Sequence, residues 1–181
     1  MYEPVKWGVL STANIARTQF LPALMDAHNA VLQAVGSRDL AKAQEVASQF
    51  GAAKAYGSYD ELLSDPEVEA VYIPLPNSMH KEWTIKALRA GKHVLCEKPM
   101  ALNIEECDEM LQAAEEEGRL FMEAFMYRFH PQIRKIEELL QEGRIGEVQL
   151  IRGSFSFVLE DEENIRLADE LGGGSAMDVG C

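Results

Sequence analysis

The apolar residues of this chain follow two patterns that alternate along its first 143 positions. Short continuous runs, such as residues 5–10 and 70–73, are typical of strands buried on both faces. Longer segments between them repeat apolar residues every three or four positions, as amphipathic helices do. The predicted strands cover residues 5–10, 31–36, 53–56, 70–73, 93–96 and 120–125. The first predicted helix covers residues 14–19, and a second short helix is expected to open at Pro22. The other predicted helices cover residues 40–50, 59–64, 77–90, 103–118 and 131–143.

This alternation predicts the fold class. Strands that alternate with helices form βαβ units, whose right-handed crossovers give a parallel sheet with helices on both faces. We therefore predict an α/β protein whose residues 1–125 form a doubly wound parallel sheet of the Rossmann type, a dinucleotide-binding domain.

The pattern changes after Gly143. Residues 147–159 are rich in β-forming residues and alternate in places, so they predict a strand outside the βαβ series. Its apolar side chains include Phe155, Phe157 and Leu159. We interpret residues 126–181 as a connecting helix followed by the beginning of a second domain, most of which is absent from the chain.

Composition excludes several classes of partner and site. The 181 residues carry a net charge of −13 and no cluster of Lys or Arg longer than two, so nucleic acid is not expected to bind. The sequence has no signal-peptide pattern and no apolar stretch of about 18 residues, so we expect neither secretion nor a membrane span. The three cysteines are odd in number and lack metal-ligand spacing, so we expect the cytoplasm and no metal site.

The first strand-to-helix turn is the first candidate site. A Rossmann turn carries G-x-G-x-x-G, so that backbone N–H groups and the helix N-terminus can hold a pyrophosphate. The corresponding residues have small side chains where bulk would block a ligand, but include no glycine. The cofactor-binding candidates in this turn are Ser11, Thr12, Ala13, Asn14 and Ile15. An ordinary turn of small residues remains the alternative.

The end of the second strand predicts which dinucleotide binds. Ser37 and Arg38 lie where a Rossmann domain meets the adenosine ribose, and a hydroxyl with a guanidinium suits a 2′-phosphate. We therefore predict NADP rather than NAD. Asp39 could instead serve as the acidic residue of an NAD site, but we expect it to cap the helix that begins at Leu40. The alternative for Arg38 is a solvated surface arginine.

Two further loops follow the carboxyl ends of strands. In the first, the cofactor-binding candidates are Leu75, Pro76, Asn77 and His80; Asn77 is also expected to cap the next helix. His80 faces the cofactor in this interpretation, and the alternative is a histidine on the helix surface.

The second loop contains Glu97, Lys98 and Pro99 directly after an apolar strand. A lysine beside a nicotinamide can donate a hydrogen bond to a substrate oxygen or act as an acid or base. Glu97 and Lys98 are candidates for cofactor binding, and Lys98 also for catalysis. A structural Glu97–Lys98 pair at a domain boundary is the alternative.

Several segments together resemble a known family. Residues 90–99, AGKHVLCEKP, resemble the signature segment of the Gfo/Idh/MocA oxidoreductases, and residues 74–80, 123–128 and 172–180 are also similar. The branch most resembled contains NADP-dependent D-xylose dehydrogenase and trans-dihydrodiol dehydrogenase. The resemblance covers the whole chain. It departs at the glycine-free first turn, and members of the family continue well past the equivalent of Cys181.

The resemblance implies a Rossmann domain followed by an α/β domain with a large open sheet, which forms the substrate cleft and usually the oligomer interface. It also implies that Lys98 is the catalytic lysine and that Asp178 is the aspartate at the cleft. The expected protein is an NADP-dependent oxidoreductase acting on a sugar or cyclic hydroxyl compound, homo-oligomeric when full length. The alternative is a non-catalytic dinucleotide-binding or regulatory module of the same fold, because this chain lacks most of the second domain.

Overall fold

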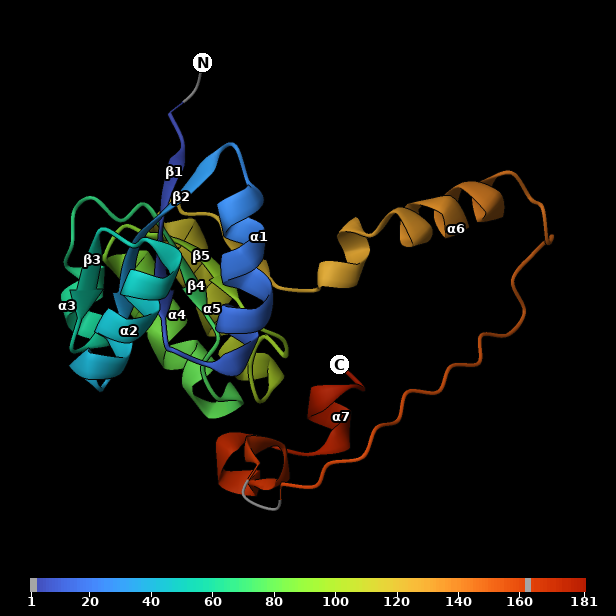
Figure 1. Ribbon diagram of the computed structural model, residues 1–181. Helices are drawn as coiled ribbons and strands as arrows, with labels where there is room; N and C mark the ends of the chain where they lie inside the picture. The colour runs from blue at the N-terminus through green and yellow to red at the C-terminus, as the bar shows by residue number, and fades with distance from the viewer. Residues whose placement is uncertain (1–2, 162–163) are drawn as a thin grey trace.

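A six-stranded parallel sheet forms the centre of the protein. The computed structural model describes residues 3–161 and 164–181. The strands lie in the order β3-β2-β1-β4-β5-β6, and every neighbouring pair is parallel (Figure 1). Their bounds are β1 Val5–Leu10, β2 Ala30–Gly36, β3 Lys54–Tyr56, β4 Ala70–Ile73, β5 His93–Cys96 and β6 Phe121–Glu123. The predicted parallel sheet is therefore confirmed.

Helices cover both faces because side chains alternate along each strand. On one face, Val9 and Val35 pack with α1 (Leu21–Asp26) and α2 (Leu40–Phe50). On the other face, the adjacent residues Leu10 and Ala34 pack with α3 and α4, which cover Tyr59–Leu63 and His80–Arg89, and with α5, which covers Ile104–Glu116. These four strand residues are completely buried. Two apolar cores therefore hold the sheet between its helices.

The first helix differs from its prediction. Residues Ala16–Phe20 form a π-helical segment, η1, which continues directly into α1. The backbone at Phe20 and Leu21 keeps helical angles, so Pro22 lies within the first turn of α1 and opens no separate helix. The expected two helices are therefore one continuous helical stretch.

The order of the strands places a ligand site. The chain winds from β1 toward β3 on one side and from β4 toward β6 on the other, so the winding direction reverses between β1 and β4. In open α/β sheets, ligands bind beyond the carboxyl ends of the strands at such a reversal. The loops after Leu10, Ile73 and Cys96 all meet there.

The segment after β6 leads away from the sheet (Figure 1). After η3 (Met126–Phe129), helix α6 (Pro131–Gln141) contains no buried residue. Residues 147–160 run as an extended chain without a strand, so the strand predicted over 147–159 is wrong for the described residues. A strand needs a neighbouring strand to pair with its backbone groups, and within the described part of the chain no strand lies beside this segment.

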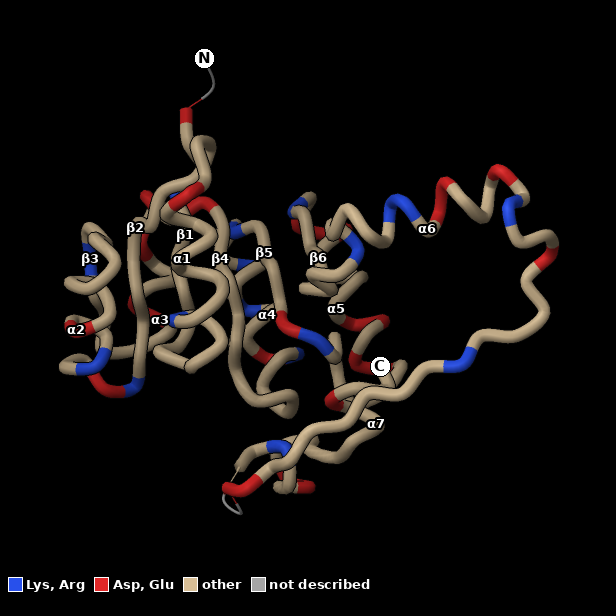
Figure 2. The backbone as a smooth tube through the Cα atoms, turned by 45° about the vertical axis from the view of Figure 1, so that its right-hand side comes forward, with Lys and Arg blue, Asp and Glu red and all other residues tan. Residues whose placement is uncertain are grey.

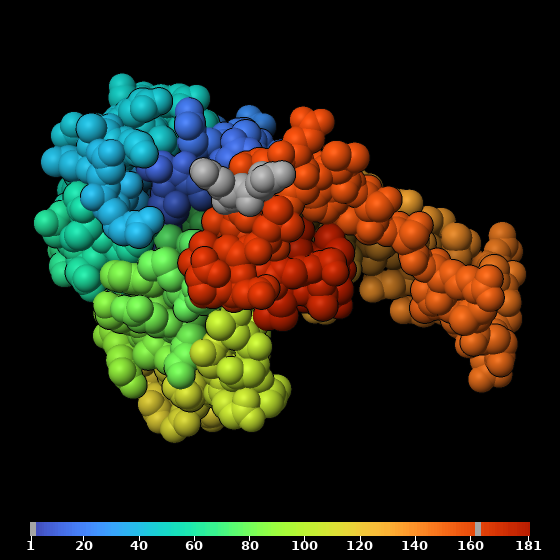
Figure 3. All heavy atoms as spheres, turned by 90° about the horizontal axis from the view of Figure 1, so that it is seen from below, coloured from blue at the N-terminus to red at the C-terminus, as the bar shows by residue number. Residues whose placement is uncertain are grey.

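The C-terminal residues return to the sheet domain. They form three short helical elements, η4 Ile165–Leu167, η5 Asp169–Leu171 and α7 Ser175–Asp178. Figure 2 shows this C-terminal segment near the chain that follows β5. Seen from below, it lies against the residues coloured green (Figure 3). Residues 164–181, called the C-terminal segment below, thus form a wall beside the carboxyl ends of the strands.

Candidate active site

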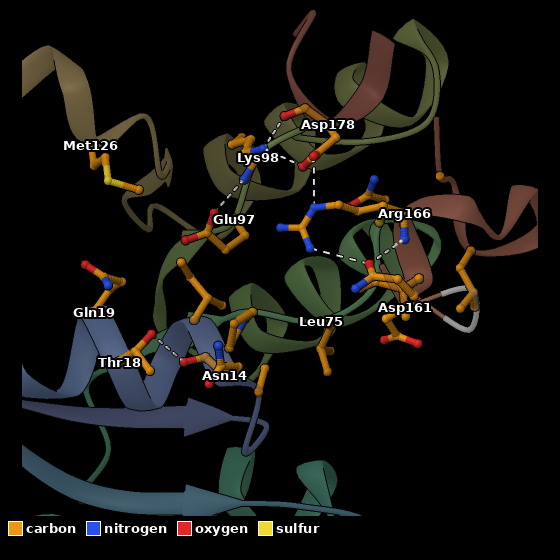
Figure 4. A pocket seen from close by; sticks show the side chains of 18 residues that line it. Asn14, Thr18, Gln19, Leu75, Glu97, Lys98, Met126, Asp161, Arg166 and Asp178 are labelled. Carbon is orange, nitrogen blue, oxygen red and sulfur yellow. Dashed lines mark hydrogen bonds and ion pairs between the residues drawn. The ribbon is translucent and has the colours of Figure 1, made fainter. Parts of the chain in front are cut away.

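A cleft of about 590 Å³ opens between the sheet domain and the C-terminal segment (Figure 4). The first βα turn contributes one side of it, the loops after β4 and β5 form its base, and the C-terminal segment closes the other side. Of the residues predicted from the sequence, the cleft is lined by Ala13, Asn14, Ile15, Leu75, Asn77, Glu97, Lys98 and Asp178. The structure therefore brings together residues from four separate parts of the chain.

Lys98 and Asp178 meet across the cleft. The Lys98 Nζ atom lies 3.0 Å from Asp178 Oδ1 and also donates to the backbone carbonyl of Asp178. The other carboxylate oxygen accepts from Arg166 Nε at 2.9 Å. Burial alone would raise the pKa of Asp178, but the bonds and charges of the two cations outweigh it and hold that pKa below its ordinary value. Asp178 is therefore an anion that holds two cations at the wall of the cleft.

Glu97 does not take part in that cluster. Its Oε1 atom accepts a hydrogen bond from the Tyr72 hydroxyl at 2.5 Å, and its Oε2 atom accepts from the backbone N–H of Lys98 at 3.3 Å. Among the described residues, the ion pair of the Lys98 side chain is with Asp178 and not with Glu97. The purely structural Glu97–Lys98 side-chain pair is thus not formed. The peptide bond between Lys98 and Pro99 is cis.

The first βα turn keeps a backbone shape that usually needs glycine. Ser11 has φ +147°, and it occupies the position of the first glycine in the Rossmann hexad. Its hydroxyl accepts from the N–H of Ala13 at 2.9 Å, which helps hold the turn. The first helical bond after the turn runs from Arg17 N to Ala13 O, so the preceding N–H groups have no partner within the helix. Thr12 and Ser11 lie outside the cleft lining.

At the end of β2, Ser37 is buried and Arg38 is exposed. Asp39 Oδ1 accepts from the N–H groups of Ala41 and Lys42 at 3.0 and 3.3 Å, which confirms the predicted cap of α2. Arg38 lies near the phenol of Tyr59; burial raises the pKa of that phenol, and the cation opposes the shift. Ser37 and Arg38 lie outside the lining of the 590 Å³ cleft.

His80 occupies a different place from the one predicted. Its ring is completely buried, so it neither faces the cleft nor lies on the helix surface. Its Nδ1 atom is 2.7 Å from the carbonyl oxygen of Pro99, and its Nε2 atom is 2.8 Å from that of Leu75. Burial lowers the pKa of His80 and outweighs the two carbonyl groups, which act in the opposite direction. His80 therefore joins the loops after β4 and β5 from behind.

Asn77 also has a different partner from the predicted one. Residues Asn77–Met79 form a 3₁₀ turn, η2, and α4 begins after it without a side-chain cap. The Asn77 Nδ2 atom donates to the carbonyl oxygen of Gly172 at 2.7 Å, which ties the sheet domain to the C-terminal segment. The predicted cap is thus wrong. Pro76 lies outside the cleft lining.

Other lining residues have no signal in the sequence. Thr18 and Gln19 follow the first turn, and Met126 follows β6. Arg166 reaches the cleft from a short 3₁₀ turn that no pattern predicts. Tyr72 looks like an ordinary apolar residue of a buried strand, and only its contact with Glu97 distinguishes it. Arg166 and Tyr72 are recognised only by their partners in the folded structure, which are Asp178 and Glu97.

Within residues 3–161 and 164–181, no group of three His, Cys, Asp or Glu side chains is arranged to hold a metal ion. In the same part of the chain, no helix has the length and apolar character needed to cross a membrane.

Comparisons with known proteins agree with this architecture. Residues 5–125 match the Gfo/Idh/MocA oxidoreductase family, NAD-binding Rossmann fold, and residues 133–181 match the Gfo/Idh/MocA C-terminal domain. An uncharacterized oxidoreductase of Rhizobium meliloti is 46% identical over 97% of this chain and 53% of its own length. D-xylose 1-dehydrogenase (NADP(+)) 2 of Haloferax volcanii is 43% identical over 97% of this chain and 54% of its own length.

A solved structure is similar over nearly the whole chain. It is a 3-ketoreductase from Actinomadura kijaniata in complex with NADP and TDP-benzene. It is 38% identical, with a TM-score of 0.93 over 98% of this chain and 55% of its own. The chain spans about half the length of the curated relatives it matches. On the family match to residues 5–125 and these identities, the chain belongs to the Gfo/Idh/MocA family of oxidoreductases.

Proposed function

We propose that this chain forms the dinucleotide-binding domain and one wall of the substrate cleft of an NADP-dependent oxidoreductase. The substrate is a sugar or cyclic compound that is oxidised at a hydroxyl-bearing carbon or, in the reverse direction, reduced at the corresponding carbonyl carbon. The observation that carries the proposal is the position of the Lys98 ammonium, which lies at the carboxyl end of β5 and is held at the cleft by Asp178. The named relatives are a xylose dehydrogenase and a 3-ketoreductase, which supports this substrate class.

The first βα turn fits the pyrophosphate of a dinucleotide. Unpaired N–H groups at a helix N-terminus attract anions, and this helix begins at the cleft with Ala13, Asn14 and Ile15 in the lining. Ser11 keeps the turn in a conformation close to that of a glycine turn. The Ala13 methyl group stands where a glycine would carry only a hydrogen, so a pyrophosphate bound at this turn would have less room to approach the backbone. We propose Ser11, Thr12, Ala13, Asn14 and Ile15 as this part of the site.

The choice of NADP rests on the end of β2. Asp39 uses its carboxylate to cap α2, so it does not act as a ribose-binding acid in this conformation. Arg38 is exposed and next to Ser37, where a guanidinium and a hydroxyl suit a 2′-phosphate. Glu97, Leu75, Pro76 and Asn77 remain proposed contacts for the rest of the cofactor, whereas His80 supports two of these loops from behind.

The chemistry is divided between the cofactor and the protein. The bound nicotinamide supplies the hydride chemistry. The Lys98 ammonium binds the reacting oxygen of the substrate, where it stabilises developing negative charge and exchanges a proton with that oxygen. Asp178 fixes the ammonium and accepts hydrogen bonds from neighbouring substrate hydroxyls. The C-terminal segment excludes water from this side of the cleft.

A substitution at Lys98 tests the proposal. In the protein expressed from its whole reading frame, Lys98→Met should lower kcat/KM with NADP⁺ and an aldose by at least about 10²-fold, because a positioned acid–base group is lost. The affinity for NADP⁺ should change little, since the phosphate contacts lie elsewhere. Lys42→Met, on the exposed face of α2, is the matched control.

Three outcomes distinguish the alternatives. Normal turnover by the Lys98→Met protein would contradict the catalytic role, and loss of folding would make Lys98 a structural residue. Binding of NADP⁺ by the wild-type protein without turnover of any compound in an aldose and cyclic diol panel would favour a regulatory module. We also propose that the full-length protein is cytoplasmic and forms a homo-oligomer. Cell fractionation measures the location, and sedimentation measures the oligomeric state.

A further inference from the structure

Tyr72 makes an unusual contact for a residue in the middle of a sheet. It lies in β4, its side chain is almost completely buried, and its ring stacks on Phe20 with 4.0 Å between centroids. Its hydroxyl donates to Glu97 Oε1 at 2.5 Å. Burial and the nearby Glu97 charge both raise the pKa of Tyr72, so the phenol keeps the proton that it donates. The contact is therefore a charge-assisted hydrogen bond from a fixed donor.

The direction of this bond matters because of the residue next to Glu97. Glu97 and Lys98 are adjacent in the chain and carry opposite charges at the same cleft. In Figure 4 the Glu97 carboxylate and the Lys98 side chain point to different sides, and Lys98 points toward Asp178. A half-buried carboxylate without a donor would take the nearest cation as its partner. For Glu97, the adjacent residue Lys98 supplies a cation at the same cleft.

We propose that Tyr72 is a positioning residue, which holds the Glu97 carboxylate away from the Lys98 ammonium. The hydroxyl satisfies one carboxylate oxygen, and the Lys98 backbone N–H satisfies the other at 3.3 Å. The Lys98 side chain is then left to Asp178 and to a substrate oxygen. This inference deepens the function proposed above, because it rests on Lys98 acting through its side-chain nitrogen.

The stacked ring and the hydroxyl have separate roles, so they can be tested separately. Tyr72→Phe removes the hydroxyl and keeps the ring on Phe20. If Tyr72 were only a core residue, this change would leave the chemistry of Lys98 as it was. In the proposal, it releases the carboxylate of Glu97 toward Lys98, and an additional Glu97→Gln substitution cancels the effect because the amide carries no charge.

The measurement is the rate at which acetic anhydride acetylates Lys98 in the 181-residue chain, followed by peptide mass spectrometry at one fixed pH. Only the uncharged amine reacts with the anhydride, and a new ion pair with Glu97 lowers the fraction of Lys98 in that form. Tyr72→Phe should slow the labelling of Lys98 by about three- to fivefold, which is the upper range for a partly exposed ion pair. In the Glu97→Gln background, Tyr72→Phe should have less than about a 1.5-fold effect, as expected when the coupled partner is removed.

Two controls separate this effect from a general change in structure. The exposed Lys42 is measured in the same digest and should keep its rate in every variant. Tyr56→Phe removes a hydroxyl that bonds to Asp65 outside the cleft, and it should leave Lys98 labelling unchanged. If Tyr72→Phe does not fold, Glu97→Asp provides a second test. Its shorter carboxylate loses the Tyr72 hydroxyl while the tyrosine stays in place, and Lys98 labelling should again slow.

Unchanged Lys98 labelling in Tyr72→Phe or Glu97→Asp would overturn the proposal. An equal effect of Tyr72→Phe with and without Glu97→Gln would also overturn it, because Tyr72 would then act independently of Glu97. The labelling needs neither cofactor nor substrate. Its result is therefore independent of whether the protein turns over NADP⁺, and failure of the oxidoreductase proposal would be recognised separately in the turnover assay.

Discussion

His80 makes the stability of the sheet domain depend on pH in a predictable direction. A neutral imidazole has one N–H group, so it can donate to only one of the carbonyl oxygens of Leu75 and Pro99. The imidazolium could donate to both, but burial opposes the charge and lowers the pKa below its ordinary value of 6.5. The folded protein should therefore keep His80 neutral at pH values where the unfolded chain protonates it.

The sign follows from counting protons. As the pH falls through about 6.5, the unfolded chain binds a proton at His80 and the folded chain does not, so the free energy of unfolding decreases. The slope for one proton is at most about 1.4 kcal/mol per pH unit, and it ends when the pH falls below the folded pKa. His80→Gln should remove this slope. At pH 8 the same variant should cost about 1–3 kcal/mol, because a flexible amide replaces the fixed ring N–H that a buried carbonyl oxygen accepts.

Urea unfolding between pH 5.5 and 8, followed by the fluorescence of Trp7 and the buried Trp83, measures the effect. The quantity compared is the difference between wild type and His80→Gln at each pH, which cancels the carboxylates common to both. His28→Gln changes an exposed histidine and should keep the wild-type slope. A difference that stays constant, or that grows in favour of wild type as the pH falls, would mean that the fold contains the imidazolium bonded to both carbonyls.

Three other predictions concern the cofactor, the C-terminal segment and the exposed chain. Arg38→Ala should weaken NADP⁺ binding by about 1.5–3 kcal/mol and leave NAD⁺ binding nearly unchanged in calorimetry, and an equal loss for both would show that Arg38 does not meet the 2′-phosphate. Gly172→Ala should release the C-terminal segment, because Gly172 has φ +78° and an added Cβ atom would lie 2.3 Å from Leu102 Cδ2. Hydrogen exchange in that segment should rise by the equivalent of about 1–3 kcal/mol, and unchanged protection would contradict the contact. Phe155 and Phe157 are 73% and 53% exposed, so replacing both by Ser should reduce self-association in sedimentation velocity, whereas a wild-type chain that stays monomeric at all concentrations would refute this expectation.

The parts of the fold that the sequence predicts are those with local causes. The apolar run 70–73 is a strand because it is buried on both faces, and Asp39 caps α2 because its carboxylate reaches N–H groups two and three residues ahead. The strand expected at residues 147–159 fails for the opposite reason. Its β-forming residues favour an extended backbone, but without a neighbouring strand the backbone N–H and C=O groups have no ladder to join.

The site was predictable to the extent that it follows strand ends. Lys98 and Asp178 are separated by 80 positions in the sequence, and in the structure Lys98 Nζ lies 3.0 Å from Asp178 Oδ1. Their catalytic roles stay predictions. The place of His80 and the capping role of Asn77 were predicted wrongly, because the sequence near a helix start does not show which partner a histidine or asparagine side chain will have. The carbonyl groups of Pro99 and Gly172 decide their positions, and those partners come from remote parts of the chain. No local pattern contains this information.

The way in which the C-terminal segment is attached determines how the cleft can admit a ligand. Its polar links to the sheet domain include one bond from Asn77 and the ion pair of Lys98 with Asp178. The extended residues 147–160 connect it to the rest of the chain, so a released wall would stay at a raised effective concentration near the cleft. The entropic cost of rejoining such a tether grows only logarithmically with its length. Neither apolar core described above includes a residue of the C-terminal segment. Separation of this wall would therefore break its contacts with the loops and leave both cores intact, so we expect a ligand to enter the cleft without unfolding of the sheet.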